Sequence, residues 1–438
     1  MNIIREEKRV LRLTYLLVMA LFFNVAIITP TINNNAVIIG AIICGLMAYA
    51  HFVIRRFYPD GDKFLLLFAN ILAVIGIAMI YRLDLPLRGG TFIADGVTTN
   101  LAVKQVLFFA LGMIGFILIV VIVPDLKRFN KYKYLYLVVT IIFMAMGTFL
   151  GEETYGAKNW VNIAGFGFQP SEFGKIALVA YLASALRDYE KPSKFWIRAA
   201  SRIGIKNEKY YSLISLVEPA LVMGVSLLFM LAQTDLGSAL IFFAIALTML
   251  YIATSKKKYV IIALLLFAVG GTIGYFLFYH VRVRVMIWRN PWEYGYDQGL
   301  QLVQSLIAIS SGGLFGVGLG SGFPNYIPVV ESDFIFAAIC EELGILTGFA
   351  IIIFNFLLFY RCIRAALYTK DKFSRLLVVG YSTMLVAQTL VIIGGVTGAI
   401  PLTGITLPFV SYGGSSMLIS YFALGIIQKI SEESNSYE

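Results

Sequence analysis

Carboxylates cluster where a long polar, glycine-rich stretch of this sequence runs into an apolar one. Asp333 lies in the sequence Glu-Ser-Asp-Phe-Ile-Phe, and Glu341 and Glu342 follow within the apolar run. A charged group at the mouth of a membrane span is costly, so such residues usually serve a function. A carboxylate can act as a general base toward a hydroxyl, and desolvation at a membrane boundary raises its pKa toward the working range. Asp333 is therefore the candidate catalytic group.

Plainer interpretations of these carboxylates stay open. Ser332 or Asp333 could be the N-cap of the helix that follows, because Ser and Asp are favoured there. Glu341 and Glu342 would lie about 12 Å along that helix, at 1.5 Å per residue. At 100° per residue they are rotated by roughly 80° and 180° from Asp333, so both cannot face one site with it. We expect at least one of them to have a structural partner.

The composition indicates a membrane protein with many spans. Hydrophobic residues make up 59% of the 438 positions and charged residues only 14%. About twelve apolar segments are long enough to cross roughly 30 Å of hydrocarbon as helices. They include residues 172–186, 334–360 and 409–428. The predicted fold class is an all-α polytopic membrane protein with large extracytoplasmic loops.

The basic residues set the expected orientation. Most of the 35 Lys and Arg residues fall in alternate segments between spans, which places these segments and both termini in the cytoplasm. This bias explains the net charge of +10 without a nucleic acid partner. Cys44, Cys340 and Cys362 have no paired spacing, so neither a disulfide framework nor a zinc site is indicated.

The long outward loops are the expected place for function. They span residues 151–171 and 280–333, and the short segment 401–408 would face the same side. Lys158, Arg282 and Arg284 are among the few basic residues expected outside. Cations there could meet negative charge that develops on a leaving group.

Three other features have structural interpretations: a pair of charged residues, a tryptophan and a glycine run. Glu172 and Lys175 favour a buried packing pair over a catalytic one, and an aromatic residue such as Trp160 can simply mark the membrane interface. The glycine run 316–322 follows no strand and lacks the Gly-x-Gly-x-x-Gly order, which argues against nucleotide binding. We expect it to form a tight bend that brings the backbone close to a substrate.

Six segments in order resemble the SEDS family of membrane glycosyltransferases, represented by RodA, FtsW and SpoVE. They are Gly156–Trp160, Gln169–Glu172, Gln233–Gly237, Gln301–Ser305, Ser332–Ala337 with Glu341–Gly344, and Leu407–Ser416. The chain departs from the usual family pattern at Thr234 and near Ile392. The resemblance implies a ten-helix core at residues 64–430, after a two-helix N-terminal addition at 1–63. The tail at 431–438 is short and polar, so we expect it to be disordered.

The resemblance also implies an activity. Members polymerise lipid II at the outer face of the cytoplasmic membrane, with inversion at the anomeric carbon and release of undecaprenyl diphosphate. Asp333 would be the catalytic base. The substrate-binding residues would be Trp160, Lys158, Arg284, Arg282, Gln304 and Ser305, while Glu172, Lys175, Glu341 and Glu342 would support the site.

Cofactor and partner expectations follow from the same resemblance. A divalent cation, Mg²⁺ or Mn²⁺, could act through phosphate oxygens, and no organic cofactor is expected. The expected partners are lipid II, membrane lipids and a class B penicillin-binding protein. A lipid II flippase and a scaffold that recruits this transpeptidase stay open as alternative functions. The choice between elongation, division and sporulation also stays open.

Overall fold

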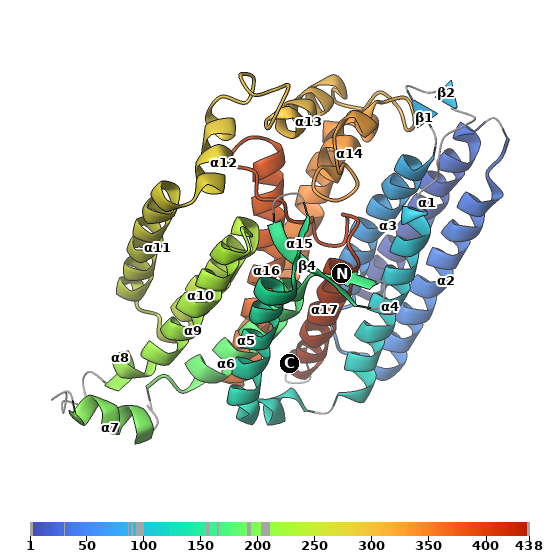
Figure 1. Ribbon diagram of the computed structural model, residues 1–438. Coiled ribbons are helices and arrows are strands. Elements are labelled where there is room, and N and C mark those ends of the chain that lie inside the picture. Colours follow the sequence, from blue (N-terminus) through green and yellow to red (C-terminus); the bar gives the residue numbers. More distant parts are fainter. Residues whose placement is uncertain are drawn as a thin grey trace. The chain divides into compact units, whose positions relative to one another are not determined.

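The structure is a computed structural model of the chain (Figure 1). It describes residues 3–29, 31–85, 87–88, 91–92, 100–123, 125–154, 157–163, 166–190, 194–202 and 211–435. Gly156 of the first family-like segment lies outside these residues. The chain divides into two compact units, each described here by itself. Unit 1 holds residues Met1–Ile122, His280–Cys362 and Gln388–Glu438, and unit 2 holds Val123–Tyr279 and Ile363–Ala387.

Unit 1 is built mainly from helices. Its elements are α1 (Ile3–Ile28), α2 (Asn34–Phe57), α3 (Phe64–Asp84), β1 (Leu87–Arg88), β2 (Thr91–Phe92), α4 (Leu101–Ile122), α12 (Tyr279–Arg289, from its second residue), α13 (Leu300–Ser311), η3 (Pro324–Tyr326), α14 (Ile335–Leu343), most of α15 (Ile345–Tyr368), the end of α16 (Lys372–Val396) and α17 (Gly414–Asn435). Helix α3 is the most enclosed candidate span of this unit: within its most apolar stretch of 18 residues, 94% are buried. A helix that is apolar all round is expected at such a position.

The N-terminal helices are part of this same unit. Helix α1 packs against α2 and α3, and α2 also packs against α4. Helix α17 lies along α4 (Figure 1) and reaches α3, where the Tyr421 hydroxyl donates to Asn70 Oδ1 at 2.9 Å. The predicted addition at residues 1–63 is thus a pair of helices that covers the first core helices.

Unit 2 combines helices with one small sheet. Its elements are η1 (Leu126–Tyr132), α5 (Lys133–Leu150), β3 (Glu152–Thr154), β4 (Ala157–Ile163), β5 (Phe166–Phe168), α6 (Pro170–Arg187), α7 (Lys194–Arg202), α8 (Tyr211–Ser215), α9 (Val217–Ala232), α10 (Leu236–Thr254), α11 (Lys257–Leu277) and the remaining parts of α15 and α16. The three strands form an antiparallel sheet in the order β3-β4-β5, in which Glu152 pairs with Trp160 and Val161 with Phe168.

Ten helical segments of the described chain are long and apolar enough to cross a membrane. They contain α1, α2, α3, α4, α5, α9, α10, α11, α15 and α16. Helices α6 and α17 cover two further predicted spans but are not among the ten. Their polar residues explain the difference, because α6 carries Glu172 and Lys175 while α17 ends in a charged segment. The predicted all-α polytopic fold is confirmed, with these ten segments and with helices α6 and α17 at two further predicted spans.

The predicted span 334–360 is two helices instead of one. Helix α14 ends at Leu343, and Gly344 has a φ of 84°, a left-handed conformation that a side chain would strain. Helix α15 then begins at Ile345. Glu341 and Glu342 therefore lie in the last turn of a short helix, and the expectation that they sit deep within a continuous span is wrong.

The C-terminal segment also differs from its prediction. Helix α17 continues to Asn435, well into the tail 431–438 that was expected to be disordered. Its last turns bind the residues that follow α2: Ser431 Oγ accepts from the Asp62 amide at 3.2 Å, and Glu432 Oε1 accepts from the Asp60 amide at 3.4 Å. These contacts explain why the helix extends beyond the apolar pattern.

The glycine run forms a tight bend around the end of α14. The Val317 and Gly318 amides donate to the carbonyls of Glu341 and Glu342 at 3.0 and 3.1 Å. These contacts satisfy carbonyl groups that the helix end leaves without partners. Gly316 has a φ of 83°, and a Cβ placed there would clash with the Glu342 carbonyl. The predicted bend is confirmed, and the chain it approaches is α14.

Replacing Gly316 by alanine should therefore destabilise unit 1 by at least about 2 kcal/mol, through backbone strain and the clash together. Thermal unfolding in detergent measures this loss. Gly270→Ala in α11 is the control, because nothing lies within 4 Å of the position its Cβ would occupy. An equal unfolding temperature for both variants would contradict the role of this bend.

Candidate functional site

Asp333 lies in the turn before α14 and is half-buried. The N-cap of α14 is Phe334, so neither Ser332 nor Asp333 occupies the cap position. Instead, the Ser332 hydroxyl donates to Asp333 Oδ1 at 3.0 Å. A hydrogen bond to the charged form of a carboxylate favours that form. Since Phe334 takes the cap position, the interpretation of Ser332 or Asp333 as the helix cap is wrong.

The segment after α16 packs against this turn. Ser411 Oγ donates to the Ser332 carbonyl at 2.5 Å and accepts from the Leu407 amide at 2.8 Å. Gly404, with a φ of 68°, lies close to the carboxylate: a Cβ placed there would lie 3.4 Å from Asp333 Oδ2. The segment 401–408 and Asp333, far apart in sequence, thus form one wall of the candidate site.

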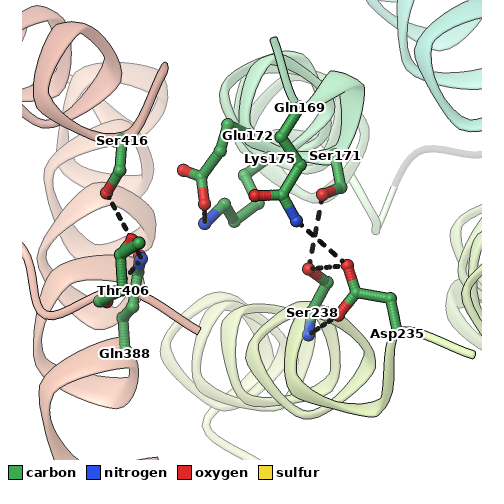
Figure 2. A network of polar contacts seen from close by, with 9 residues as sticks. All are labelled: Gln169, Ser171, Glu172, Lys175, Asp235, Ser238, Gln388, Thr406 and Ser416. Carbon is green, nitrogen blue, oxygen red and sulfur yellow. Dashed lines mark hydrogen bonds and ion pairs between the residues drawn. The ribbon is translucent and has the colours of Figure 1, made fainter. Parts of the chain in front are cut away.

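Gln388 and Ser416 support the same segment from α16 and α17. Gln388 Nε2 donates to the Thr406 carbonyl at 3.0 Å, and Thr406 Oγ1 donates to Ser416 Oγ at 2.8 Å (Figure 2). These bonds hold the backbone just after Gly404. Both supporting residues belong to unit 1, as Asp333 does.

The predicted arginines both lie on α12. Arg282 is exposed, whereas Arg284 is half-buried and its Nη1 donates to the Leu402 carbonyl at 3.1 Å. An arginine has five N–H donors, so this bond uses one of them. Arg284 thus contacts the segment that reaches Asp333, while Arg282 faces away from the packed interior.

Gln304 and Ser305 lie side by side in sequence on α13 but differ in burial. Ser305 is fully buried, and its hydroxyl donates to the Val396 carbonyl at 3.0 Å. Gln304 is half-buried. The structure therefore places Ser305 in contact with the backbone behind the site wall, where it supports the fold of the segment.

Glu341 and Glu342 face the glycine run. Glu341 Oε1 accepts from the Phe323 amide at 2.8 Å, and Glu342 Oε2 accepts from the Gly320 amide at 3.0 Å. Glu342 Oε1 also lies 2.5 Å from Arg82 Nη2, and both side chains of this ion pair are fully buried. Each glutamate has structural partners, and sequence analysis missed Arg82. Its signal was an arginine in the last turn of an otherwise apolar helix.

In unit 2, strand β4 carries Lys158 and Trp160. Lys158 is exposed, and its amide donates to the Gln233 carbonyl at 3.1 Å, which fixes the strand to the end of α9. Trp160 is half-buried against β5, with Cε3 3.7 Å from the position that a Cβ on Gly167 would occupy. The side chain of Lys158 is thus open to solvent, whereas the indole of Trp160 is partly covered.

Glu172 and Lys175 form a buried ion pair on α6, with Lys175 Nζ 2.8 Å from Glu172 Oε1 (Figure 2). Beside it, Asp235 joins two of the family-like segments. The carboxylate of Asp235 accepts from Gln169 Nε2 at 3.2 Å, from the Ser238 amide at 2.9 Å and from the Ser238 hydroxyl at 2.7 Å. Asp235 is thereby the N-cap of α10 and a link to the start of α6.

Asp235→Ala should lower the free energy of unfolding by about 2 kcal/mol, because it removes a helix cap and leaves buried donors without an acceptor. Asp235→Asn keeps one acceptor oxygen and should lose clearly less. Thermal unfolding of the purified variants in one detergent compares them. If the alanine and asparagine variants unfolded together with wild type, the cap would not stabilise unit 2.

Carboxylates, imidazoles and thiols are the side chains that could ligate a metal ion. Within the described residues, no group of three or more His, Cys, Asp and Glu side chains could hold a metal ion. Mg²⁺ usually binds proteins through one or two carboxylates together with phosphate oxygens and water.

The fold and this site define a polytopic helical membrane protein with a half-buried carboxylate at the foot of a long loop. The model of the cell cycle protein family of FtsW, RodA and SpoVE matches residues 62–436. The chain belongs to this family. The match begins just before α3, after the two N-terminal helices.

Known relatives cover most of the chain. The peptidoglycan glycosyltransferase RodA of Mycobacterium leprae is 38% identical over 392 residues, which are 90% of this chain and 82% of the relative. Stage V sporulation protein E of Bacillus subtilis is 31% identical over 384 residues, covering 85% of this chain and 97% of the relative.

Solved structures share the fold. A chain from a structure described as the structural coordination of polymerization and crosslinking by a peptidoglycan synthase complex has a TM-score of 0.66 and 23% identity, and the match covers 85% of this chain and 98% of that one. The rod shape determining protein RodA of Thermus thermophilus has a TM-score of 0.57 and 21% identity, with 85% and 97% covered.

Proposed function

We propose that this chain is a peptidoglycan glycosyltransferase that polymerises lipid II into glycan strands. Membership of the FtsW, RodA and SpoVE family supports the proposal, as do relatives named peptidoglycan glycosyltransferases. The observation that carries it is the position of Asp333. Its carboxylate is half-buried, is hydrogen-bonded by Ser332 and lies against the backbone at Gly404.

Asp333 acts as the general base in this proposal. It takes the proton from a sugar hydroxyl of one lipid II as that oxygen attacks the anomeric carbon of another. The new glycosidic bond forms as the bond to the diphosphate breaks, which inverts the anomeric configuration. Undecaprenyl diphosphate leaves with the electron pair of the broken bond.

Cationic side chains meet the charge that develops on the diphosphate. Arg284 is the first candidate because it already contacts the wall of the Asp333 site through Leu402. Exposed Arg282 is a further candidate in unit 1. In unit 2, Lys158 and Trp160 are candidates because they lie in a family-like segment. A bound Mg²⁺ or Mn²⁺ would supply additional positive charge at the phosphate oxygens.

The reaction belongs at the outer face of the cytoplasmic membrane, with both termini inside. The distribution of Lys and Arg residues among the segments between spans supports this orientation. A class B penicillin-binding protein is the proposed partner, because its transpeptidase acts on the strand that a polymerase produces. A solved relative of the same fold comes from a peptidoglycan synthase complex, which favours such an assembly.

The experiment is a polymerisation assay with purified full-length chain and lipid II, with and without the cognate penicillin-binding protein. Polymer from lipid II is expected, since the chain carries the proposed base. Movement of labelled lipid II across liposomes without polymer would identify a flippase. Recruitment of the transpeptidase with neither polymer nor transport would identify a scaffold. Either of these two outcomes would overturn the proposed function.

A further inference from the structure

Three side chains of α12 and α13 hold the backbone that joins α16 to the Asp333 site. We call residues 396–404 the linking loop. Ser305 Oγ donates to its Val396 carbonyl at 3.0 Å, Trp288 Nε1 donates to its Gly398 carbonyl at 2.9 Å, and Arg284 Nη1 donates to its Leu402 carbonyl at 3.1 Å. All of these residues belong to unit 1.

Helix α16 ends in a tight turn at the start of the linking loop. The Ala399 amide donates to the Gly394 carbonyl at 2.8 Å, and Gly398 adopts a φ of 73°. Many helices end at a glycine in the left-handed conformation, which turns the chain sharply. The carbonyl of Gly398 then points to the indole of Trp288, so the indole fixes the residue at which the chain changes direction.

The other end of the linking loop is Gly404, which lies against Asp333 Oδ2. Displacing the chain at Gly398 therefore moves the wall against which the carboxylate rests. Trp288 and Arg284 are four residues apart on α12, so they lie on one face of the helix. The indole has a single donor, and that donor is used here.

We propose that Trp288 is a positioning residue for Asp333, acting together with Ser305 through the linking loop. This inference rests on the proposed function. The two donors keep Gly404 against the carboxylate, so that Asp333 meets the attacking hydroxyl in one orientation. A misplacement of about 1 Å can cost on the order of a hundredfold in rate. The loss appears in kcat and leaves KM for lipid II unchanged, because neither donor binds substrate.

The test compares Trp288→Phe with Trp292→Phe in the polymerisation assay. Both substitutions remove one indole N–H and keep an aromatic ring, but Trp292 is 64% exposed and lies beyond the end of α12. Trp288→Phe should lower kcat by about 10-fold to 100-fold with KM within twofold of wild type. Trp292→Phe should keep the wild-type kcat. Thermal unfolding of each variant separates this effect from loss of the fold.

A second comparison uses Ser305→Ala and the double variant Trp288→Phe/Ser305→Ala. Since both donors act on one loop, the double variant should lose less kcat than the product of the single losses. If the loss in the double variant equalled the product of the two single losses, the two donors would act independently. That result would overturn their shared action through the linking loop. A kcat for Trp288→Phe equal to that of Trp292→Phe, or a loss confined to KM, would overturn the positioning role.

The two proposals fail in different ways. If the wild-type chain makes no polymer while a reference polymerase does so under the same conditions, the proposed function fails and the positioning role fails with it. If wild type makes polymer, Asp333→Asn does not, and Trp288→Phe behaves as wild type, only the positioning role fails.

Discussion

Asp333→Asn is expected to lower the rate of lipid II polymerisation by about 100-fold to 10,000-fold, the usual contribution of a general base. The amide has nearly the same size as the carboxylate, so the contacts with Ser332 and Gly404 can persist. It cannot accept the proton of the attacking hydroxyl. The unfolding temperature and KM for lipid II should therefore stay close to wild type while kcat falls.

Asp297→Asn is the matched control for this variant. Asp297 is also an acidic residue between α12 and α15, but its side chain is exposed. The same change of charge there should leave kcat within twofold of wild type. Polymer formed by Asp333→Asn at the wild-type rate would show that another group accepts the proton.

Arg82→Met should be the most destabilising single change in unit 1, costing about 3–5 kcal/mol. The substitution leaves the buried Glu342 carboxylate without its closest cation, 2.5 Å away in wild type. It also removes the donor to the Gly322 carbonyl at 3.3 Å, which helps to hold the glycine run. Unfolding in a graded denaturing detergent, or by heat, measures the loss.

Two further variants check the reason for this loss. Arg82→Met/Glu342→Leu removes both charges and should recover much of the stability, because a buried pair is often replaceable by apolar residues. Arg187→Met breaks the pair between Arg187 and Asp188, whose side chains are 31% and 57% exposed, and should cost at most about 1 kcal/mol. A double variant no more stable than Arg82→Met would mean that the ion pair is not what Arg82 contributes.

The spans could be predicted largely from the sequence because apolar length is a direct requirement of the membrane. The break at Gly344 could not. Its direct neighbours Leu343 and Ile345 are both apolar, and the left-handed backbone at Gly344 divides α14 from α15. Helices α6 and α17 were predicted as spans from their apolar length, although both carry polar residues that lower their mean hydropathy.

The candidate site was predicted in part. Asp333 stood out as a charge at the start of an apolar run, and its environment agrees with a functional residue. Trp288, Arg82 and Gly404 did not stand out. Their contacts join segments more than 70 residues apart, and long-range pairing of this kind leaves no periodic pattern in one sequence.

The ion pair between Arg82 and Glu342 also has a consequence for biosynthesis. Glu342 is translated 260 residues after Arg82, which at about 5–20 residues per second means a delay of roughly 13–52 s. During that time the guanidinium must remain at the water interface, which a long side chain near a helix end can reach. Helix α3 can thus enter the membrane early, but its end at Arg82 becomes enclosed only when α14 emerges from the ribosome. Closure of unit 1 is a late event in the synthesis of the chain.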